Sequence, residues 1–548
     1  MSCLRMLCFG DNMDHQLGVH TSTDFARKNV ILSAMHPSSL RMAGSQLIEH
    51  DHNSFWTREE QEKCKVHVMN TTKVFNGQTI RKVICASNRT FFITDSFKVY
   101  CCGLNDFNVL PVSGNTTRTT NAFENSNNDG HNITTNSNPS NTTINNTSHF
   151  RLNQTKNRKT HITTPTLCDL LEEDIVDISC GIFYNIFICR RTLTMYACGN
   201  NSYGQCSQPV EQGLQKSIRI PQLVDLSLLK PTSKEIIQVS CGFNHTLLLT
   251  NDKRVYISGS PENGKLGFDP TDNAVQDMLV DGVVSNLNLL SCKKLDSKTV
   301  QVEAGANWSL FLTQEGHVYF CGQSKLFVDQ VFTPTIVTTV KPVSKIASGN
   351  YHGFFVFRDG QTECGLAGFG RFIEGQLGQK IPISRDKIDG TSLKDVNIPS
   401  ELVHAFETIS VGDFHSVCTT TTNEVFVTGS NISNQLGFYE DNMRETSLSE
   451  PVLTRFTKLP RHYTYQDLNN SKNFRTRVSC GSLHTFIYFI PHENDNLNSV
   501  MAQFTMGLFA SSAFQDVDLI CSRKTSKYDE IYPSTRHPNE GPTKKKKR

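Results

Sequence analysis

The chain repeats one short pattern seven times, and this repetition limits its fold more than any other feature. In the clearest copy, residues 239–267, a strand of small residues ends near Gly and His, a second strand follows, and a Gly-rich turn completes the unit. A unit of this size cannot bury its apolar face alone, so neighbouring copies must stack against each other. The architecture must therefore consist of seven similar units placed side by side.

The pattern has as many cores as turns, but one turn and one core at the chain ends lack a neighbouring counterpart. Cores of small residues start at Ile84, Ile178, Val239, Val302, Ile346, Ile409 and Val478, and Gly-rich turns start at Gly10, Gly103, Gly199, Gly259, Gly322, Gly368 and Gly429. The first turn has no core before it, and the last core, residues 478–488, has no turn after it. In a ring, a strand near residues 4–9 would complete the last blade, and the sheet edges would be sealed. We therefore predict an all-β fold over residues 1–490, a seven-bladed β-propeller closed by an N-terminal strand that joins the C-terminal blade.

Each copy contains signals for four strands. In residues 246–258, two apolar runs flank an Asn-Asp pair, which is typical of a hairpin, and similar hairpins recur in other copies. Outer strands are indicated by proline followed by apolar residues at Pro221, Pro334 and Pro451. Proline cannot donate to a strand ladder, so it is tolerated at the edge of a sheet.

The repeat resembles the regulator of chromosome condensation repeat. The resemblance covers roughly residues 4–490 and is carried by Ser240-Cys241-Gly242, His245-Thr246, Val255-Tyr256 and the turn at residues 429–437. A propeller of the Trp-Asp type would carry that pair in each blade, whereas this chain has two Trp in all. A kelch propeller would show paired glycines, and no Gly-Gly occurs. In the first copy Ser87 and Thr90 replace Gly and His, and the turn at Gly322 lacks the usual Gly-Gln-Leu-Gly ending.

The Gly and His residues of the cores are predicted to be framework residues. The glycines are Gly181, Gly242, Gly305, Gly349, Gly412 and Gly481, and the histidines are His245, His352, His415 and His484, with Thr90, Tyr184 and Trp308 at the same position in other copies. A catalytic base is needed once per site, whereas a residue repeated around a ring serves every blade. We expect each His to form a hydrogen bond that fixes the turn after the core strand, and the glycines of the Gly-rich turns to adopt positive φ.

Cysteine is abundant, with 18 residues, but no Cys-x-x-Cys pair occurs. Many of the cysteines fall just before a core or turn glycine, where a small apolar side chain suits a crowded strand. The chain has no phosphate-binding loop of the Gly-x-x-x-x-Gly-Lys-Ser/Thr type, and no Ser/His/Asp or paired-carboxylate signature. We therefore predict no metal site, no cofactor, and a non-catalytic binding protein.

Function must then depend on positions that differ between copies. The residue after the core glycine is Asn88, Ile182, Phe243, Ala306, Asn350, Asp413 or Ser482. In the founding member of the resembled family, the chromatin-bound exchange factor for the GTPase Ran, this face engages the GTPase, and acidic residues help to displace the nucleotide. Gly412-Asp413-Phe414-His415 resembles such a turn, whereas the neighbouring copies carry no acid. Asp413 and Asn350 are the candidate partner-binding residues, and the alternative for Asp413 is a solvated turn residue.

Two segments fall outside the repeat. Residues 113–160 are dominated by Asn and Thr and contain few aliphatic residues, which predicts a disordered insertion in the first blade. Residues 498–548 form a C-terminal extension, in which 498–520 resemble the start of a BTB/POZ domain. Only 28 residues follow Ile520, so the segment is either a truncated relative or an accidental likeness. A truncated relative would imply a ubiquitin-ligase component as a partner.

The chain ends in the basic run Lys544, Lys545, Lys546, Lys547 and Arg548. Such a run is a nuclear import signal, a nucleic-acid patch or a solvated tail. The start of the chain lacks a long apolar segment, which predicts neither a secretory signal nor a membrane span. We expect an intracellular protein, cytoplasmic, or nuclear through the basic run. The net charge of +2 gives no strong footprint for nucleic acid over the whole chain.

Three functional hypotheses follow. The first is a protein-interaction propeller that acts as a regulatory adaptor or scaffold, which requires only the ring and its variable turns. The second is a guanine-nucleotide exchange factor for a Ran-like small GTPase, which also requires an acidic surface near Asp413. The third is a chromatin-associated binding protein, which requires the basic run. We favour the first, because the copies next to Asp413 lack a second acid.

Overall fold

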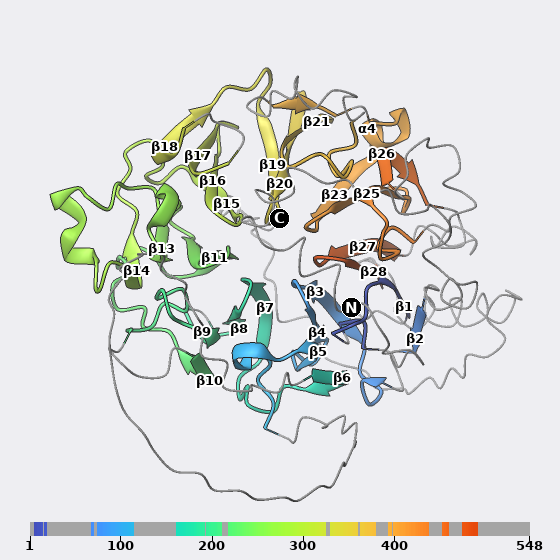
Figure 1. The fold of residues 1–548 in the computed structure, drawn as a ribbon, viewed down its shortest axis with the longest axis horizontal. Coiled ribbons are helices and arrows are strands. Elements are labelled where there is room, and N and C mark those ends of the chain that lie inside the picture. Colours follow the sequence, from blue (N-terminus) through green and yellow to red (C-terminus); the bar gives the residue numbers. More distant parts are fainter. Residues whose placement is uncertain are drawn as a thin grey trace, which may run out of the picture.

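The computed structural model describes residues 5–14, 16–18, 67–70, 74–113, 161–191, 193–210, 217–324, 329–359, 362–379, 393–396, 398–437, 452–459 and 474–491. Within these ranges, seven antiparallel sheets of four strands each stand around one axis (Figure 1). The predicted all-β, seven-bladed propeller is therefore confirmed.

Each blade contains four strands in the same order from the axis outward. The innermost strands are β3 (Ile80–Cys85), β7 (Ile175–Cys180), β11 (Ile236–Cys241), β15 (Thr299–Ala304), β19 (Val343–Ser348), β23 (Phe406–Val411) and β27 (Phe474–Cys480). The second strands are β4 (Arg89–Thr94), β8 (Tyr184–Cys189), β12 (His245–Thr250), β16 (Trp308–Thr313), β20 (His352–Asp359), β24 (His415–Thr420) and β28 (His484–Pro491).

The outer half of each blade completes the sheet. The third strands are β5 (Val99–Leu104), β9 (Met195–Asn200), β13 (Val255–Gly259), β17 (Val318–Gly322), β21 (Thr362–Gly370), β25 (Val425–Ser430) and β1 (Arg5–Gly10). The outermost strands are β6 (His161–Leu167), β10 (Ser217–Leu223), β14 (Val284–Leu289), β18 (Val331–Val337), β22 (Lys394–Asp395), β26 (Val452–Lys458) and β2 (His67–Asn70). Blades 1 to 6 follow the chain from β3 to β26, and blade 7 combines β27 and β28 with β1 and β2.

Blade 7 closes the ring, because it joins the two ends of the propeller. β1 pairs antiparallel with β28, and this register places Leu7 opposite Ile487 and Phe9 opposite Thr485. The predicted N-terminal closing strand is therefore confirmed. The sequence pattern did not indicate β2, which pairs with β1 and forms the outer edge of the same blade. Blade 7 thus takes two strands from the N-terminal part of the chain and two from the C-terminal part.

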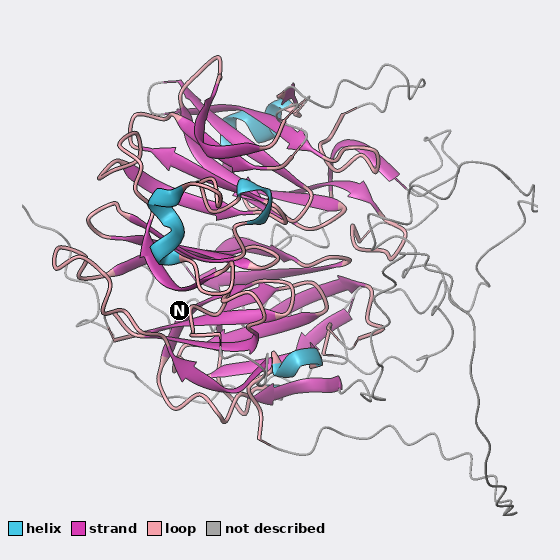
Figure 2. Cartoon of the chain, turned by 60° about the vertical axis from the view of Figure 1, so that its left-hand side comes forward, coloured by secondary structure: helices cyan, strands magenta, loops and turns pink. Residues whose placement is uncertain are grey.

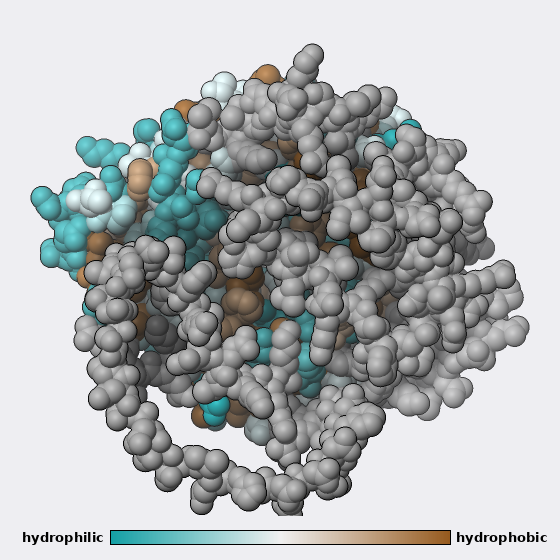
Figure 3. Space-filling model, viewed as in Figure 1, coloured by the Kyte–Doolittle hydropathy of each residue, from teal (hydrophilic) through white to brown (hydrophobic). Residues whose placement is uncertain are grey.

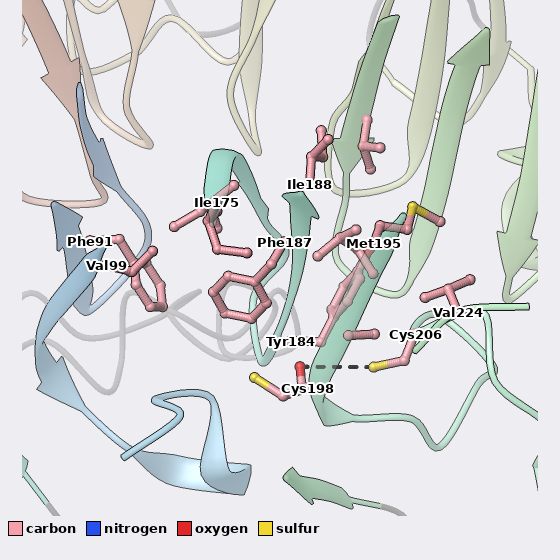
Figure 4. Close-up of a cluster of buried hydrophobic side chains, with 14 of the residues drawn as sticks. Phe91, Val99, Ile175, Tyr184, Phe187, Ile188, Met195, Cys198, Cys206 and Val224 are labelled. Carbon is pink, nitrogen blue, oxygen red and sulfur yellow. Dashed lines mark hydrogen bonds between the residues drawn. The ribbon is translucent and has the colours of Figure 1, made fainter. Parts of the chain in front are cut away.

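The hydrophobic core lies between neighbouring blades. Every residue of β4, β8, β12, β16 and β24 is buried, because each of these strands packs against a blade on both sides. Figure 4 shows one such interface, where Phe91 and Val99 of blade 1 face Ile175 and Phe187 of blade 2. The rings of Phe91 and Phe187 meet edge to face, with centroids 5.8 Å apart. Burial on both faces explains why these strands are nearly continuous apolar runs.

Side chains of neighbouring blades seal the open edges of the innermost strands. The side-chain amide of Gln238 accepts from Val302 N at 3.1 Å and donates to Val302 O at 2.8 Å. Ser240 Oγ accepts from Ala304 N at 2.9 Å. These bonds take the place of a further strand, because an unpaired backbone edge in a crowded interior would leave polar groups unsatisfied.

The ring has two different faces. His245, the first residue of β12, pairs with Gly259, the last residue of β13, so the turn before β12 and the turn after β13 lie at the same end of the blade. We call this end, in all blades, the turn face. The opposite end, the hairpin face, carries the tight hairpins between second and third strands and the connections from one blade to the next.

Helices are short in the described part of the chain. They are α4 (Ser400–Ala405), η2 (Asp106–Asn108), η3 (Glu262–Gly264) and η4 (Asn273–Met278), and Figure 2 shows them among the loops around the strands. Among the described residues, no helix has the length and hydrophobicity needed to cross a membrane.

Several predictions about segments can be compared with the structure. Pro221 lies in β10, Pro334 lies in β18 and β26 starts directly after Pro451, so the three prolines do mark outermost strands. Residues 114–160 and 492–548 lie outside the described residues. The predicted disorder, the BTB/POZ resemblance and the basic run at residues 544–548 therefore remain predictions.

Candidate functional site

One hydrogen-bond arrangement recurs where neighbouring blades meet at the turn face. His245 Nε2 lies 3.1 Å from Ser309 Oγ in the next blade, and Ser309 Oγ donates to Lys265 O at 2.6 Å. The same side-chain pairing joins His352 to Ser416, His415 to Thr485, and His484 to Thr90. We expected each His to fix its own turn, but its side chain instead links its blade to the next one. The four His side chains therefore bond one blade to the next.

The hydroxyl proton decides which tautomer these histidines adopt. Ser309 donates its single hydroxyl proton to Lys265 O, so the proton between Ser309 and His245 must belong to His245 Nε2. Burial lowers the pKa of this His to about 3, and it does the same for His352, His415 and His484. The four rings are therefore neutral at pH 7, and they are poor proton acceptors for catalysis near neutral pH.

These histidines should make the fold sensitive to mild acid. Their pKa of about 3 in the folded state lies below the ordinary value of 6.5, so the unfolded chain binds more protons between these limits. Stability is therefore lost as the pH falls through this window, by about 1.4 kcal/mol per pH unit for each His. His415→Gln keeps a donor for Thr485 but removes one titrating group. We expect it to reduce the slope of the unfolding free energy against pH by the contribution of about one proton.

The measurement is urea unfolding at several pH values between about 5 and 7. A matched control is His317→Gln, because His317 is exposed in the hairpin turn between β16 and β17, away from the buried position of the four histidines. Equal slopes for the wild type and His415→Gln would contradict the assignment of a buried neutral imidazole.

The first blade uses different residues, and the predicted alignment of its core is wrong by one position. Arg89, not Thr90, stands opposite the turn glycine of its blade, where other blades place His, Tyr or Trp. Ala86 N donates to Arg89 O at 2.9 Å, as the core glycines donate in other blades, so Ala86 and not Ser87 replaces glycine. The variable position of this copy is consequently Ser87 rather than Asn88.

Arg89 reproduces the link between blades with its guanidinium group. Arg89 Nη2 donates to Asn185 Oδ1 at 2.8 Å, and Asn185 Nδ2 donates to Val109 O at 2.6 Å. Arg89 also donates to Gly181 O at 2.7 Å and to Ile182 O at 2.8 Å. Arg and Asn together thus replace the His and Thr or Ser pair found at four other interfaces.

Blade 4 departs from the arrangement in a different way. Its next blade carries Gly353 where the others carry Thr, Ser or Asn, so no hydroxyl is available at that position. Trp308 occupies the His position and donates from Nε1 to Ser348 Oγ at 3.1 Å. In blade 4 a Trp thus replaces His where the next blade offers no hydroxyl at this position, whereas Tyr184 of blade 2 still meets Thr246, with 3.0 Å between the two hydroxyl oxygens.

The core glycines are required by close packing between blades. A Cβ atom on Gly412 would lie 2.5 Å from Gly481 O and 2.6 Å from the ring of His415. The turn glycines serve a different purpose, since Gly259 has a φ of +112°, as predicted for the Gly-rich turns. A side chain at Gly412 would therefore clash, and one at Gly259 would strain the backbone.

Most cysteines in the described ranges are buried, and the others are partly buried. Burial raises the pKa of Cys180, Cys198 and Cys480 to about 12, so these thiols are protonated at neutral pH. Thiolate is the form that binds metals and reacts. No group of three His, Cys, Asp or Glu residues suited to a metal ion occurs in the described ranges.

The two predicted partner-binding residues contact each other. Asn350 Nδ2 donates to Asp413 Oδ1 at 2.7 Å, and Ser482 Oγ donates to Asp413 Oδ2. These residues follow the core glycines of blades 5, 6 and 7, so one carboxylate ties together three blades. Asp413 is only 8% exposed, and the alternative of a solvated turn residue is wrong. Burial raises the pKa of its carboxyl, although the two hydrogen bonds and Arg371 oppose this shift.

Aromatic rings lie beside this cluster on the turn face. The centroids of Tyr351 and Phe414 are 5.9 Å apart, and Phe243 of blade 3 meets Tyr351 edge to face at 6.1 Å. Blade 4 carries Ala306 at its variable position, and Ala306 N donates to Asn350 O at 3.2 Å. The three rings are half-buried, so part of each remains accessible to a partner.

A cation is fixed over this aromatic row. The guanidinium of Arg371 lies 5.5 Å from the centroid of Phe414 and is bound by both carboxylate oxygens of Glu374. Burial, followed by the charge of Asp413, raises the pKa of Tyr351 to about 12, so its hydroxyl stays protonated. We call Asn350, Asp413, Ser482, Tyr351 and Phe414 the central cluster.

Sequence reasoning found part of the central cluster and missed the rest. The variable positions indicate Asp413 and Asn350, but nothing in the sequence marks Ser482 as their partner. The position before His carries an aromatic residue in three copies, Phe183, Tyr351 and Phe414, and Leu483 in a fourth. That row of apolar residues is the signal that could have indicated a surface at the mouth of the ring.

Comparisons with known proteins agree with the repeat. The model of the Regulator of chromosome condensation (RCC1) repeat matches residues 194–249, 236–265 and 406–435. The crystal structure of Prp20p from Saccharomyces cerevisiae, a protein with binding properties to Gsp1p and histones, superposes with a TM-score of 0.57 at 13% identity, covering 92% of this chain and 96% of that one. The likeness supports the propeller fold.

Curated relatives share only part of their length with this chain. The chain is 25% identical over 310 residues to human "Probable E3 ubiquitin-protein ligase HERC6", covering 53% of this chain and 25% of that protein. It is 33% identical over 102 residues to human "RCC1-like G exchanging factor-like protein", covering 19% of this chain and 20% of that protein. The chain thus spans about a quarter or less of the length of these relatives.

Proposed function

We propose that this chain, a propeller that carries RCC1 repeats, is a protein-interaction module that acts as a regulatory adaptor or scaffold. Its partner binds on the turn face at the central cluster. A ubiquitin-ligase component is one class of partner, and the partial likeness to HERC6 supports including it. The proposal concerns binding and does not require catalysis by the chain.

The central cluster is the observation that carries this proposal. Its polar members satisfy each other across three blades, which fixes the half-buried rings of Tyr351 and Phe414 in place. Aromatic side chains on a rigid support are frequent among the residues that contribute most to protein binding. A surface that is already ordered also loses less conformational entropy when a partner binds.

The repeated histidines support a binding role over hydrolytic chemistry. Each of the four is buried, has a pKa of about 3 and is engaged with a hydroxyl of the next blade. A general base works best with a pKa near the working pH. The hydrogen bonds between blades are therefore a sufficient role for these histidines.

An exchange factor for a Ran-like small GTPase is the second candidate. It is favoured by the position of Asp413 in the turn between Gly412 and His415, and by the relative named as a G exchanging factor-like protein. Against it, both carboxylate oxygens of Asp413 already accept hydrogen bonds and the residue is 8% exposed. An acid held in this way is better suited to shaping the surface than to contacting a GTPase.

One experiment with two readouts separates the candidates. Proteins retained by the full chain from the native cell lysate are quantified by mass spectrometry, and the release of a fluorescent nucleotide from Ran is followed with the same preparation. We expect Phe414→Ser to reduce the retention of specific partners by about tenfold or more, because it removes an aromatic anchor worth about 2 kcal/mol or more. We expect no acceleration of nucleotide release.

The matched control is Val340→Ser, which changes an 87% exposed apolar residue on the hairpin face. Thermal unfolding of both variants checks that each substitution changes the surface and leaves the fold intact. Retention that is equal in Phe414→Ser and Val340→Ser would overturn the adaptor proposal. Accelerated nucleotide release that disappears in Asp413→Ala would instead establish the exchange factor.

A further inference from the structure

Exposed apolar side chains form an arc on the turn face. They lie at the tips of turns in five consecutive blades, from blade 5 through blade 7 to blade 2, and each is between 39% and 46% exposed: Ile373, Ile432, Met13, Phe107, Phe183 and Tyr203. Ile373, Ile432 and Met13 hold the same position in their turns, three residues after a glycine with positive φ. In blade 5 this glycine is Gly370, which pairs with His352, and not Gly368. We call these six residues the apolar arc. Apolar side chains exposed together on one face can supply contacts for a partner.

The turns hold the apolar arc in fixed positions. In the turn that carries Ile432, Asn431 Oδ1 accepts from Leu436 N at 2.8 Å, and Gln435 Oε1 accepts from Ser433 N at 2.9 Å. The turn that carries Met13 repeats both bonds with Asn12 and Gln16. Phe107 and Phe183 also support each other, with ring centroids 5.0 Å apart. The arc is therefore an ordered surface before any partner arrives.

Blade 3, next to the end of the arc at blade 2, carries an acidic loop. Residues 268–283, between β13 and β14, carry Asp269, Asp272, Asp277 and Asp281 and no Lys or Arg. Asp272 caps η4 by accepting from Ala274 N at 2.9 Å, which orders the loop. Figure 3 shows the surface at the left of the view, over blade 3, as mostly hydrophilic. We call residues 268–283 the acidic loop.

Carboxylates outnumber cations across the described turns of the whole turn face. The carboxylates are Asp11, Asp14, Asp106, Glu262, Asp269, Asp272, Asp277, Asp281, Asp329, Glu374 and Asp413, and the cations are Arg89, Lys265 and Arg371. Arg89 and Lys265 are almost fully buried, and Arg371 is paired with Glu374. The described turns of this face therefore carry an excess of negative charge, although the whole chain is near neutral.

We infer that the turn face binds a separate protein segment that carries both Lys or Arg and large apolar side chains. The basic side chains lie over the acidic loop, and the apolar side chains pack on the apolar arc. This inference rests on the proposed binding function and adds the chemistry of its partner. Opposite charges guide the partner to the surface and set its orientation, whereas the apolar contacts supply most of the affinity.

The same charge pattern disfavours nucleic acid on this face. Phosphate groups would meet an excess of carboxylates, and binding of nucleic acid depends on cations. The basic run at residues 544–548 of this chain is the competing occupant, because it also carries cations. It contains no apolar residue, so it could satisfy the acidic loop but not the apolar arc.

The test uses labelled synthetic peptides of about 20 residues and the full chain, with binding followed by fluorescence anisotropy. The probe alternates Lys and Leu, and the comparison peptides alternate Lys with Ser or Glu with Leu. We expect the Lys/Leu peptide to bind at least about tenfold more tightly than either comparison, because only this peptide matches both parts of the surface. Raising the salt from about 50 mM to about 200 mM should weaken it.

Two variants of the chain divide the surface into its parts. Asp277→Lys with Asp281→Asn changes the exposed acidic loop without touching the capping residue Asp272. Ile373→Ser with Ile432→Ser changes the apolar arc. Each pair should weaken the Lys/Leu peptide by about tenfold, or about 1.4 kcal/mol. The matched controls Glu235→Lys and Val340→Ser lie on the hairpin face and should leave binding unchanged.

The outcomes decide between the occupants. Binding that neither variant pair weakens would overturn the inference, even if Phe414→Ser still abolished partner retention and so upheld the proposed function. A chain that ends at residue 543 should bind the peptide as the full chain does. Several-fold tighter binding by this shortened chain would show that the basic run occupies the face, and the inference of a separate partner would be wrong.

Discussion

A chain that starts at Asp11 is expected to lose its cooperative fold, because it lacks the strand that closes the ring. The side chains of β1 are buried on both sides: Leu7 and Phe9 join the core cluster of blade 6, and Met6 and Cys8 join that of blade 1. Truncating one buried large side chain costs about 2–5 kcal/mol. Several such losses together reach the total stability of an ordinary domain, about 5–15 kcal/mol.

Thermal unfolding by circular dichroism checks this expectation, together with the elution volume on a sizing column. The single variant Phe9→Ala gives the graded version and should lower the free energy of unfolding by about 3–5 kcal/mol. The control is a chain that ends at residue 497, which keeps every described strand. A chain starting at Asp11 that melts cooperatively within a few degrees of the full chain would show that β1 does not close the ring.

Replacing Arg89 by Ala should destabilise the fold by about 3–5 kcal/mol, the second large effect that we expect. The guanidinium satisfies Asn185 Oδ1 and the carbonyl oxygens of Gly181 and Ile182, and the residue is only 3% exposed. Without it, these acceptors stay buried with fewer donors. Each unsatisfied buried group costs about 1–3 kcal/mol.

The other interfaces show how the first one could be rebuilt. Arg89→His with Asn185→Thr restores the residue types of the His and Thr pairs, but the ring would then meet Ala86. A Cβ atom at the equivalent Gly242 would lie 2.2 Å from the ring of His245, so alanine leaves no room for a histidine. We therefore expect the double variant to remain unstable, and the further change Ala86→Gly to recover most of the loss.

Urea unfolding of the single, double and triple variants measures the coupling between these positions. Contacting residues commonly show coupling energies of about 0.5–3 kcal/mol. Ala86→Gly in the wild-type background is the control. It should not stabilise the chain, because the side chain of Arg89 has no ring that needs the space freed at position 86. Additive effects among Ala86, Arg89 and Asn185 would contradict the assignment of Arg89 to the His position.

The blade count and the closing strand were predictable because both depend on local patterns. A strand of small residues, a hairpin and a Gly-rich turn recur at each copy, and an unmatched turn at one end with an unmatched core at the other requires closure. β2 was missed because it lies isolated between long stretches without the repeat. The core of the first copy was misaligned because Arg89 shares no residue type with His, and only its pairing with Gly103 shows the equivalence.

The amino-acid sequence by itself determined that this protein is a ring of seven blades with an N-terminal closing strand, because six blades follow one another along the chain and the unmatched turn and core at the two ends make the seventh. Only the tertiary structure decided which side chains meet across the blades. Asn350, Asp413 and Ser482 are separated by 63 and 69 positions, and they touch because the closed ring sets adjacent blades side by side at the same height. Contacts of this kind depend on the geometry of the whole ring, which no single copy of the repeat contains.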